Sequence, residues 1–286
     1  MTARIGKAKL DSDPYRVMGP ALVSFSGGRT SAYMLHEIVR AHGGHLPDDV
    51  RVCFANTGKE REETLRFVHE CGVRWGVKVH WLERRDGAPG FVEVGMNSAS
   101  RNGEPFSALI AKRKFLPNAV TRYCTQELKI RPMRDFARSL GWERWSNVVG
   151  LRYDEGHRVM KMLDRNAQGS ERYDVLMPLA KAKATRSDVM TFWSEQPFDL
   201  ALRSYEGNCD LCFLKARGKL SALIRENPGM ADWWTRQEAA VGGRFVTEYS
   251  YADLSREVRA QGHLFDGFTA DDEHDVECGL LCGGDA

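Results

Sequence analysis

The sequence predicts an α/β fold, in which a parallel, twisted, Rossmann-like sheet carries helices on both faces and a helical region follows it. Three features indicate this fold. Short apolar runs alternate with amphipathic segments up to about residue 180, the first two runs each end in a polar turn containing glycine, and the pattern after Lys183 is helical. Strands that alternate with helices are typical of parallel sheets covered on both faces.

Five apolar runs have the length of strands, and the segments between them have the apolar spacing of helices. The expected strands are 21–24, 51–55, 77–82, 145–150 and 175–178, and the helices of the same region are 30–41, 62–72 and 131–140. Further helices are expected at 187–195, with Ser187 as its cap, at 215–226 and at 230–240. We expect Trp233 and Trp234 to pack between this helical region and the sheet; base stacking is the alternative.

The turn after the first strand has the composition of a phosphate-binding loop. Gly27 and Gly28 allow positive φ, which lets backbone N–H groups converge on an anion at the start of a helix. Hydroxyl donors and a cation surround them: Ser24, Ser26, Arg29, Thr30 and Ser31. The spacing matches neither the Walker loop nor GxGxxG. The alternative is an ordinary serine-capped turn.

A second polar turn, Asn56-Thr57-Gly58, follows the next strand and precedes an acidic helix start. In an open α/β sheet, ligands bind at the carboxyl ends of strands, where such turns meet. The two segments together therefore predict one ligand site at this edge of the sheet.

These residues resemble the phosphoadenylyl-sulfate (PAPS) reductase branch of the PP-loop superfamily, whose loops read Ser-Gly-Gly-x-x-Ser and Asp/Asn-Thr-Gly. Two later segments fit the same family, Tyr123-Cys124-Thr125 with Lys129 and Gly150-Leu151-Arg152 with Arg158, so that the resemblance covers residues 20–215. It implies an adenine nucleotide: ATP, AMP, adenylyl sulfate or PAPS. The implied nucleotide-binding residues are Ser24, Ser26, Gly27, Gly28, Arg29, Thr30, Ser31, Asn56, Thr57, Gly58, Lys129, Gly150, Arg152 and Arg158.

One residue of the loop departs from the superfamily. Thr30 stands where the ATP pyrophosphatases carry an aspartate. The missing carboxylate removes a magnesium ligand, and Arg29 and Thr30 instead suit a densely anionic ligand. Lys59 and Arg131 are candidates for contact with a 3′-phosphate.

Cys209 and Cys212 form a CxxC pair, whose spacing lets two thiolates face one metal ion or cluster. Seven cysteines without a secretion signal favour metal or redox chemistry over a disulfide framework. Assimilatory adenylyl-sulfate reductases hold a [4Fe-4S] cluster with a Cys-Cys pair and a distant CxxC. The resemblance therefore implies Cys124, Cys209 and Cys212 as ligands, with Tyr123 in place of the pair's other cysteine. Zinc is the alternative metal.

The tail Glu277-Cys278-Gly279-Leu280 resembles the end of the reductases, where the cysteine attacks the sulfur of the sulfonucleotide. The reductases continue with His, whereas Leu281 and Cys282 follow here. We assign Cys278 as the nucleophile or persulfide carrier and Cys282 as the fourth cluster ligand, and the two roles are interchangeable. Cys53 and Cys71 are expected to be buried.

Composition restricts the remaining properties. The net charge of +2 demands no nucleic-acid partner, although a basic cluster lies between Lys112 and Arg134. No stretch approaches the ~20 apolar residues of a membrane span, and residues 1–14 do not form a secretion signal, so a cytoplasmic protein without membrane contact is expected. We divide the chain into a PP-loop domain, residues 1–195, and a C-terminal helical region, residues 196–286, with the CxxC and the cysteine-bearing tail.

Three functions are compatible with this pattern. The first is reduction of adenylyl sulfate or PAPS, with a thioredoxin-like partner that releases sulfite. The second is an ATP-dependent sulfur transferase that delivers sulfur from a donor, through a [4Fe-4S] cluster, to a nucleobase, a nucleic acid or a small molecule. The third is a nucleotide-binding protein with a structural metal and no turnover. A Cys278→Ser variant distinguishes the first from the others.

Overall fold

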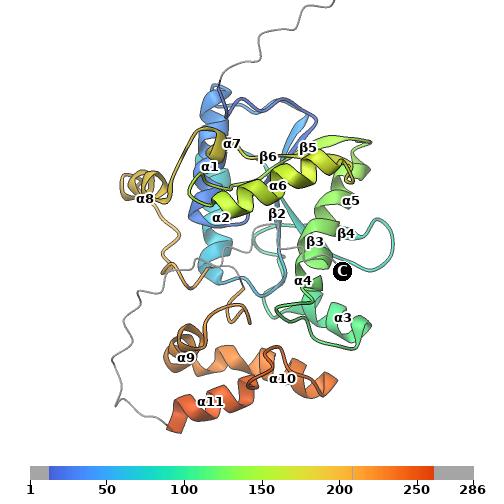
Figure 1. Cartoon of the computed structure of the whole chain (residues 1–286), viewed down its shortest axis with the longest axis vertical. Helices are drawn as coiled ribbons and strands as arrows, with labels where there is room; N and C mark the ends of the chain where they lie inside the picture. The colour runs from blue at the N-terminus through green and yellow to red at the C-terminus, as the bar shows by residue number, and fades with distance from the viewer. Residues whose placement is uncertain (1–12, 208, 261–286) are drawn as a thin grey trace, which may run out of the picture.

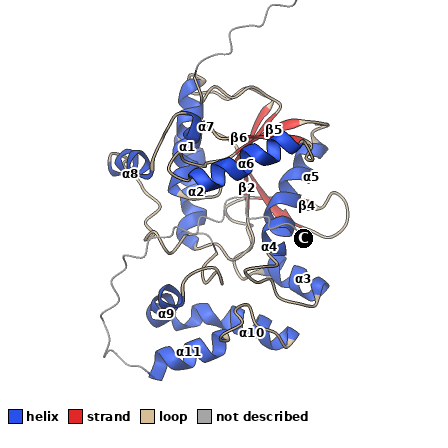
Figure 2. Cartoon of the chain, viewed as in Figure 1, coloured by secondary structure: helices blue, strands red, loops and turns tan. Residues whose placement is uncertain are grey.

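A six-stranded sheet with the order β4-β3-β2-β1-β5-β6 forms the centre of the molecule (Figure 2). The computed structural model describes residues 13–207 and 209–260. The strands are β1 (Ala21–Ser24), β2 (Val50–Ala55), β3 (Val79–Arg84), β4 (Phe91–Val94), β5 (Trp145–Val148) and β6 (Tyr173–Leu176). All neighbouring strands are parallel except β3 and β4. The α/β fold that the sequence predicts is confirmed.

Helices cover both faces of this sheet, and a separate apolar core lies under each layer (Figure 1). Val23, Val52 and Phe54 point to the face covered by α1 (Arg29–Ala41), α2 (Glu62–Arg74) and α8 (Arg186–Ser194). Leu22 and Cys53, next to them in sequence, pack on the opposite face against α5 (Arg131–Ser139) and α6 (Gly156–Gln168). Since successive strand residues alternate between faces, a strand buried on both sides must be apolar throughout.

A third core joins the C-terminal helices to the middle of the chain. The helices α9 (Arg217–Glu226), α10 (Ala231–Val241) and α11 (Tyr251–Ala260) lie together at the lower end of the molecule in Figure 1. Their buried residues, among them Trp234, pack with Phe106 of α3 (Glu104–Arg113) and Tyr123 of α4 (Tyr123–Thr125). Trp233 and Trp234 are buried, as expected, and each indole N–H donates a hydrogen bond, to Ser107 and Asp210 respectively.

Several boundaries differ from the predicted ones. The last strand ends at Leu176, because Pro178 begins the short helix α7 (Pro178–Lys181). The cap of α8 is Thr185, not Ser187: the Thr185 hydroxyl accepts from the Asp188 N–H, and the Asp188 carboxylate accepts from the Thr185 N–H. The elements that the sequence did not indicate are β4, α3, α4, α6, α7, α11, the 3₁₀ turn Pro228–Met230 and the π-helix Gln126–Ile130.

The division at residues 195 and 196 stays a prediction. Leu200 and Leu202, which follow it, are buried in the core under α1 and α2. None of the described helices has the length and apolarity needed to cross a bilayer.

The packing of α11 generates a stability prediction. Leu254 is 1% exposed in the third core, so Leu254→Ala is expected to destabilise the protein by about 2–5 kcal/mol. The matched variant Leu163→Ala removes a leucine that is 47% exposed on α6 and is expected to change stability by less than about 0.5 kcal/mol. Urea unfolding at equilibrium measures both. Equal effects of the two variants would contradict the packing of α11.

Candidate functional site

A pocket of about 360 Å³ opens at the carboxyl ends of β1 and β5, where the predicted phosphate-binding loop lies. Polar and cationic residues make up one part of its lining: Ser26, Gly27, Gly28, Arg29, Thr30, Arg152, Arg186, Arg203, Ser204 and Gly207. Val189, Met190, Leu200 and Leu202 make up the rest. The pocket therefore combines cations with an apolar wall and suits an anion attached to an apolar body.

The loop 25–28 is shaped by one glycine. Gly27 has φ +81°, and a Cβ there would lie 2.6 Å from Cγ2 of Thr64 on α2. Gly28 has φ −97° as the N-cap residue of α1, so the predicted positive φ is wrong for Gly28. The Ser26 and Ser31 hydroxyls lie 2.9 Å apart, and Ser31 Oγ accepts from the Ser26 N–H. These bonds fix the loop at the N-terminus of α1, where the helix dipole favours an anion.

Arg152 crosses from the loop after β5 to the start of α1. Its guanidinium is buried, donates to the Thr30 hydroxyl at 3.1 Å and pairs with Asp154 at 2.9 Å. Gly150 permits this approach, because a Cβ there would lie 3.2 Å from Cα of Ser31. Arg158, predicted in the same set, pairs with Glu155 on α6.

Arg29 has a structural partner. Its guanidinium donates to both carboxylate oxygens of Asp199 and to the carbonyl of Leu202. Burial raises the pKa of Asp199, but the hydrogen bonds from Arg29 and from backbone amides outweigh it and hold that pKa below its ordinary value. Arg29 thus attaches the segment after α8 to the loop and closes one side of the pocket.

Sequence reasoning missed part of this pocket. Arg186, Arg203 and Met190 line it but belong to segments outside the recognised motifs. Arg203 pairs with Glu206 and Glu226, and the Arg186 N–H donates to Asp154. No local pattern identifies these residues, since the packing of α8 brings Arg186 and Met190 to the loop and the return of the chain after α8 brings Arg203.

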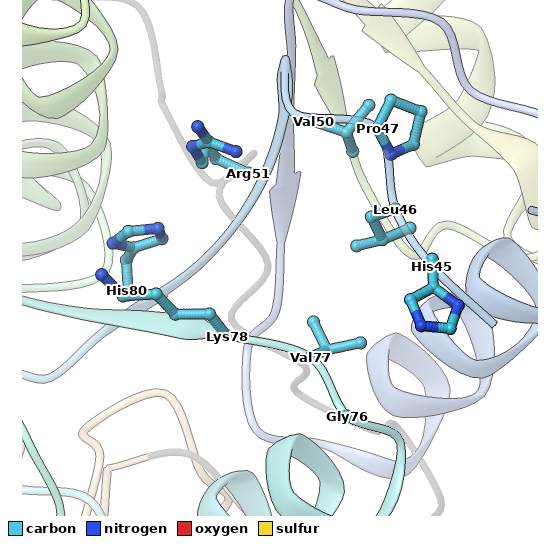
Figure 3. Close-up of a pocket in the computed structure, with 9 residues that line it drawn as sticks. All are labelled: His45, Leu46, Pro47, Val50, Arg51, Gly76, Val77, Lys78 and His80. Carbon is cyan, nitrogen blue, oxygen red and sulfur yellow. The ribbon is translucent and has the colours of Figure 1, made fainter.

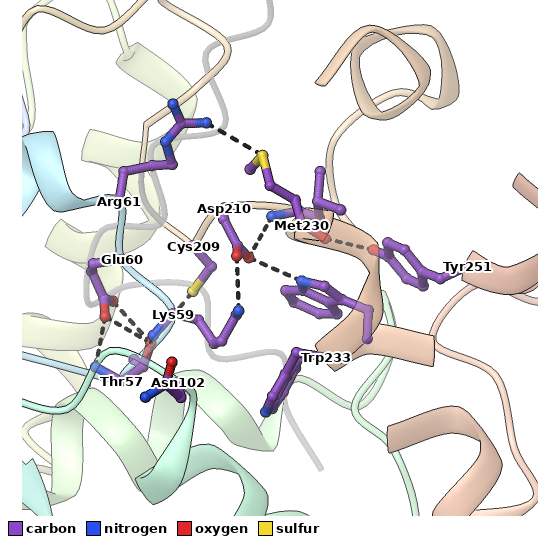
Figure 4. A network of polar contacts seen from close by, with 12 residues as sticks. Thr57, Lys59, Glu60, Arg61, Asn102, Cys209, Asp210, Met230, Trp233 and Tyr251 are labelled. Carbon is purple, nitrogen blue, oxygen red and sulfur yellow. Dashed lines mark hydrogen bonds and ion pairs between the residues drawn. The ribbon is translucent and has the colours of Figure 1, made fainter. Parts of the chain in front are cut away.

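The turn Asn56-Thr57-Gly58 does not line the same pocket. Asn56 is fully buried and donates to Glu83 and to the Ser100 carbonyl, and its side-chain oxygen accepts from the Gly58 N–H. Thr57 donates to the carboxylate of Glu60 (Figure 4). These polar groups form their hydrogen bonds within the protein, and the bonds fix the backbone of the turn. Ser24 is likewise buried and donates to Asn147.

The three predicted ligands that the structure describes lie together. Cys124, Cys209 and Cys212 line a second, smaller pocket with Thr57, Lys129 and Arg122, and the apolar part of its wall is Phe106, Leu128, Phe213, Leu214 and Trp234. The Sγ of Cys209 is 3.7 Å from the Thr57 hydroxyl. Cys278 and Cys282 lie outside the described residues.

Three cysteines around one small pocket have the ligand chemistry of a thiolate metal site. Soft sulfur ligands in an apolar pocket suit zinc or an iron–sulfur cluster. Within residues 13–207 and 209–260, however, no three His, Cys, Asp or Glu side chains converge closely enough to hold a metal ion. The three cysteines therefore fit such a group in type and line one pocket, but their sulfur atoms are not gathered at coordination distance.

Cations surround this second pocket. Lys215 is buried, and its ammonium donates to the carbonyls of Cys209 and Asp210 at 2.7 Å each. Burial lowers the pKa of Lys215, against the opposing effect of the two neighbouring cysteines. Lys129, on the π-helix that follows Cys124, lies 3.8 Å from Glu60. Positive charge near thiols favours their thiolate form.

Two other cysteines and Tyr123 are excluded from this pocket. Cys53 and Cys71 are fully buried in the sheet domain, and burial raises the pKa of both thiols. Tyr123 is 7% exposed, and its hydroxyl donates to the carbonyl of Phe115 at 2.5 Å. Tyr123 therefore does not replace the missing cysteine as a ligand.

Much of the basic cluster is paired with acids. Glu127 accepts from Arg113 and Arg131, and Lys112 pairs with Asp86. Burial raises the pKa of Glu127, but these two arginines outweigh it and lower that pKa overall.

A third pocket, also of about 360 Å³, lies at the amino ends of β2 and β3 (Figure 3). Arg51, Lys78 and His80 stand at one end of it, and Leu46 and Val77 stand toward the other. None of its lining residues belongs to the predicted motifs, and it opens at the edge of the sheet opposite the loop 25–28.

Comparison with known proteins identifies relatives of this chain. A family model described as the phosphoadenosine phosphosulfate reductase domain matches residues 20–197. The uncharacterized nin region protein ORF290 of Escherichia phage lambda is 28% identical over 226 residues, which cover 73% of this chain and 71% of the phage protein. The uncharacterized protein MJ0066 of Methanocaldococcus jannaschii is 24% identical over 226 residues, 77% of this chain and 41% of the archaeal protein. Among solved structures, the U34-tRNA thiolase NcsA from Methanococcus maripaludis with its [4Fe-4S] cluster aligns with a TM-score of 0.37 and 10% identity, over 87% of this chain and 74% of NcsA.

The Arg29–Asp199 pair generates a pH prediction. Because the folded-state pKa of Asp199 is lowered, its contribution to stability is present above the ordinary aspartate pKa of about 3.9 and is lost as pH falls below it. Asp199→Asn is therefore expected to lower the Tm at pH 7 and to approach the wild-type Tm as pH falls from 5 to 3. Thermal unfolding at several pH values measures this. A difference that stays constant down to pH 3 would contradict the ion pair.

Proposed function

The chain belongs to the phosphoadenosine phosphosulfate reductase family, and on that premise we propose that it is an enzyme that binds an adenine nucleotide and uses it in sulfur chemistry. The observation that carries this proposal is the first pocket. It joins a glycine-shaped loop at a helix N-terminus, the buried guanidinium of Arg152 and an apolar wall within about 360 Å³. Phosphate or phosphosulfate oxygens would bind at the loop and at Arg152, and the nucleoside would lie along the apolar wall.

We propose further that the second pocket holds a [4Fe-4S] cluster, with Cys124, Cys209 and Cys212 as three ligands. Zinc is the alternative occupant, because the same cysteines suit both. When bound, a cluster would supply an electron-rich, thiolate-held iron centre. Lys129 and Lys215 would stabilise the deprotonated thiols that such a group requires. Cys282 is the proposed fourth ligand.

The reaction that the family suggests is thiol-dependent reduction of adenylyl sulfate or PAPS. The thiolate of Cys278 would attack the sulfur of the bound sulfonucleotide, so that an S–S bond forms and the nucleotide leaves with the electrons of the O–S bond. A dithiol of the thioredoxin class would then reduce this thiosulfonate, release sulfite, regenerate the Cys278 thiol and become a disulfide.

One observation favours a second candidate, an ATP-dependent sulfur transferase. Tyr123 is hydrogen-bonded to the carbonyl of Phe115 and does not line the second pocket, so we propose Cys124, Cys209 and Cys212 as a set of three sulfur ligands. A three-cysteine cluster has an iron site for exogenous sulfur, and the acceptor would be a nucleobase, a nucleic acid or a small molecule. The proposed site of action is the cytoplasm.

Nucleotide binding at the loop is tested by Gly27→Ala. The added methyl group meets Thr64 at 2.6 Å and occupies a strained backbone position, so affinity for AMP and adenylyl sulfate is expected to fall by about tenfold or more. Gly43→Ala is the control, because Gly43 has φ +69° with nothing within 4 Å of its Cβ position. Titration calorimetry measures binding. Wild-type affinity in Gly27→Ala would refute the loop assignment.

The reaction is tested on the full chain purified without oxygen. Iron and sulfide analysis is expected to give about four of each per chain, and adenylyl sulfate with a dithiol is expected to yield sulfite. Cys278→Ser is expected to abolish sulfite release while AMP binding persists. Iron without sulfite, in the wild type, would replace the reductase with the sulfur transferase. One zinc ion per chain and no iron would indicate that the cysteines hold a structural metal.

A further inference from the structure

A buried ion pair connects the loop after β2 to the CxxC turn. Lys59 is 7% exposed, and its ammonium lies 2.8 Å from the carboxylate of Asp210, the residue that follows Cys209 (Figure 4). The same ammonium stands 5.1 Å from the ring centre of Trp233. The other carboxylate oxygen of Asp210 accepts from the Trp234 indole at 2.9 Å and from the Leu211 N–H at 2.7 Å.

Backbone hydrogen bonds also join the loop after β2 to the CxxC turn. The Asp210 N–H donates to the Lys59 carbonyl at 2.8 Å, and Glu60 and Cys209 form an antiparallel β-bridge. From the opposite side, the Tyr251 hydroxyl donates to the Leu211 carbonyl at 2.5 Å. The CxxC turn is therefore fixed between the loop after β2 and the C-terminal helices. The Lys59–Asp210 pair is the ion pair among these contacts.

This geometry places the Lys59 ammonium at the CxxC turn and not at the first pocket. Its ammonium is enclosed by Asp210 and Trp233, and Lys59 is absent from the lining of the first pocket, so we do not retain it as a candidate for a 3′-phosphate. A buried ion pair adds little net stability compared with apolar residues of the same size, but it accepts only one arrangement of its partners. Such a pair is suited to fixing a position.

We propose that Lys59 is a positioning residue that, through Asp210, holds Cys209 and Cys212 at the second pocket. The inference deepens the proposed function, since these are the proposed cluster ligands, but its first readout requires no metal. Without the pair, the CxxC turn opens more often, and the cysteines are presented to the pocket in more than one arrangement.

The test uses the full chain with the double substitution Lys59→Met and Asp210→Asn. Lys59→Met alone would leave a buried carboxylate without its cation, which is itself strongly destabilising. In the double variant, the asparagine oxygen still accepts from Trp234 and Leu211. The control is Lys112→Met with Asp86→Asn, because that pair has a contact of similar length, 2.9 Å against 2.8 Å, but its side chains are 59% and 50% exposed.

The first readout is alkylation of the metal-free protein by iodoacetamide, followed by peptide mass spectrometry. We expect Cys209 and Cys212 to react about tenfold faster in the double variant, because modification of a protected thiol follows its local opening. Cys124 and the affinity for AMP are expected to stay at wild-type values, as are all three cysteines in the control. Unchanged alkylation of Cys209 and Cys212 would overturn the positioning role, and so would equal acceleration at Cys124.

The second readout is the rate at which a chelator removes iron from the reconstituted protein, which is expected to rise with the alkylation rate. A wild type that takes up no iron would defeat the proposed cluster and leave the alkylation result to decide on Lys59. If the double variant loses its cooperative thermal transition, Lys59→Gln with Asp210→Asn, which also removes both charges together but keeps polar side chains at both positions, decides by the same alkylation criterion.

Discussion

The parallel pairing of β1 with both β2 and β5 is the constraint on which the rest of the molecule depends. Val23 lies opposite Val52 on one side and Val148 on the other, and β1 is buried along its whole length. Parallel register forces the loops after these three strands to leave the sheet at one edge. The loop 25–28, the turn at Asn56 and the loop with Arg152 are neighbours for this reason.

The crowding of three loops at one edge determines their residues. Gly27 lies against α2 and Gly150 against the first turn of α1, so each loop is packed on an element that belongs to another βα unit. The hydroxyl of Thr30 accepts from Arg152, whose guanidinium already pairs with Asp154, and an aspartate at position 30 would add a further negative charge there. Thr30 therefore leaves the pocket with more positive charge. A pocket with more positive charge would suit a highly anionic ligand better than one that arrives with magnesium.

The central elements were predictable because their patterns are local. β1 was predicted with its exact bounds, and α1, α2 and α5 within two residues at each end, since apolar periodicity and polar turns specify them. The edge strand β4, with partly exposed residues, and the π-helix after Cys124 have no such pattern. The predicted N-cap of α8, Ser187, was wrong for a local reason. Thr185 and Ser187 are both of residue types that cap helices, but only Thr185 has an acid, Asp188, three positions later.

The site was predictable only in part, because sequence motifs do not say which way a polar side chain points. Gly27, Thr30 and Arg152 meet in one pocket, as the family motifs imply, but Asn56 and Thr57 bond to Glu83 and Glu60 inside the protein. The motif at Asn56 is therefore explained by the support it gives to the backbone beside Cys209. The role of Glu83 could not be assigned from sequence, since its partner Asn56 lies 27 residues away in the chain.

The cysteine pocket shows why the helical region belongs to the site. Cys124 comes from the middle of the chain, Cys209 and Cys212 come from the segment before α9, and Phe106 and Trp234 of the third core line the same pocket. Most of the enclosing apolar side chains therefore come from the core that α3 shares with the C-terminal helices, whereas Thr57 comes from the sheet domain. Cys124 and Cys209 both pack against that core, so a group bound to all three thiols would join the segment of Cys124 to the CxxC turn. The buried pair of Lys59 and Asp210 joins the sheet domain to the CxxC turn without any bound group. The protein itself therefore determines where the CxxC turn lies relative to the loop 25–28.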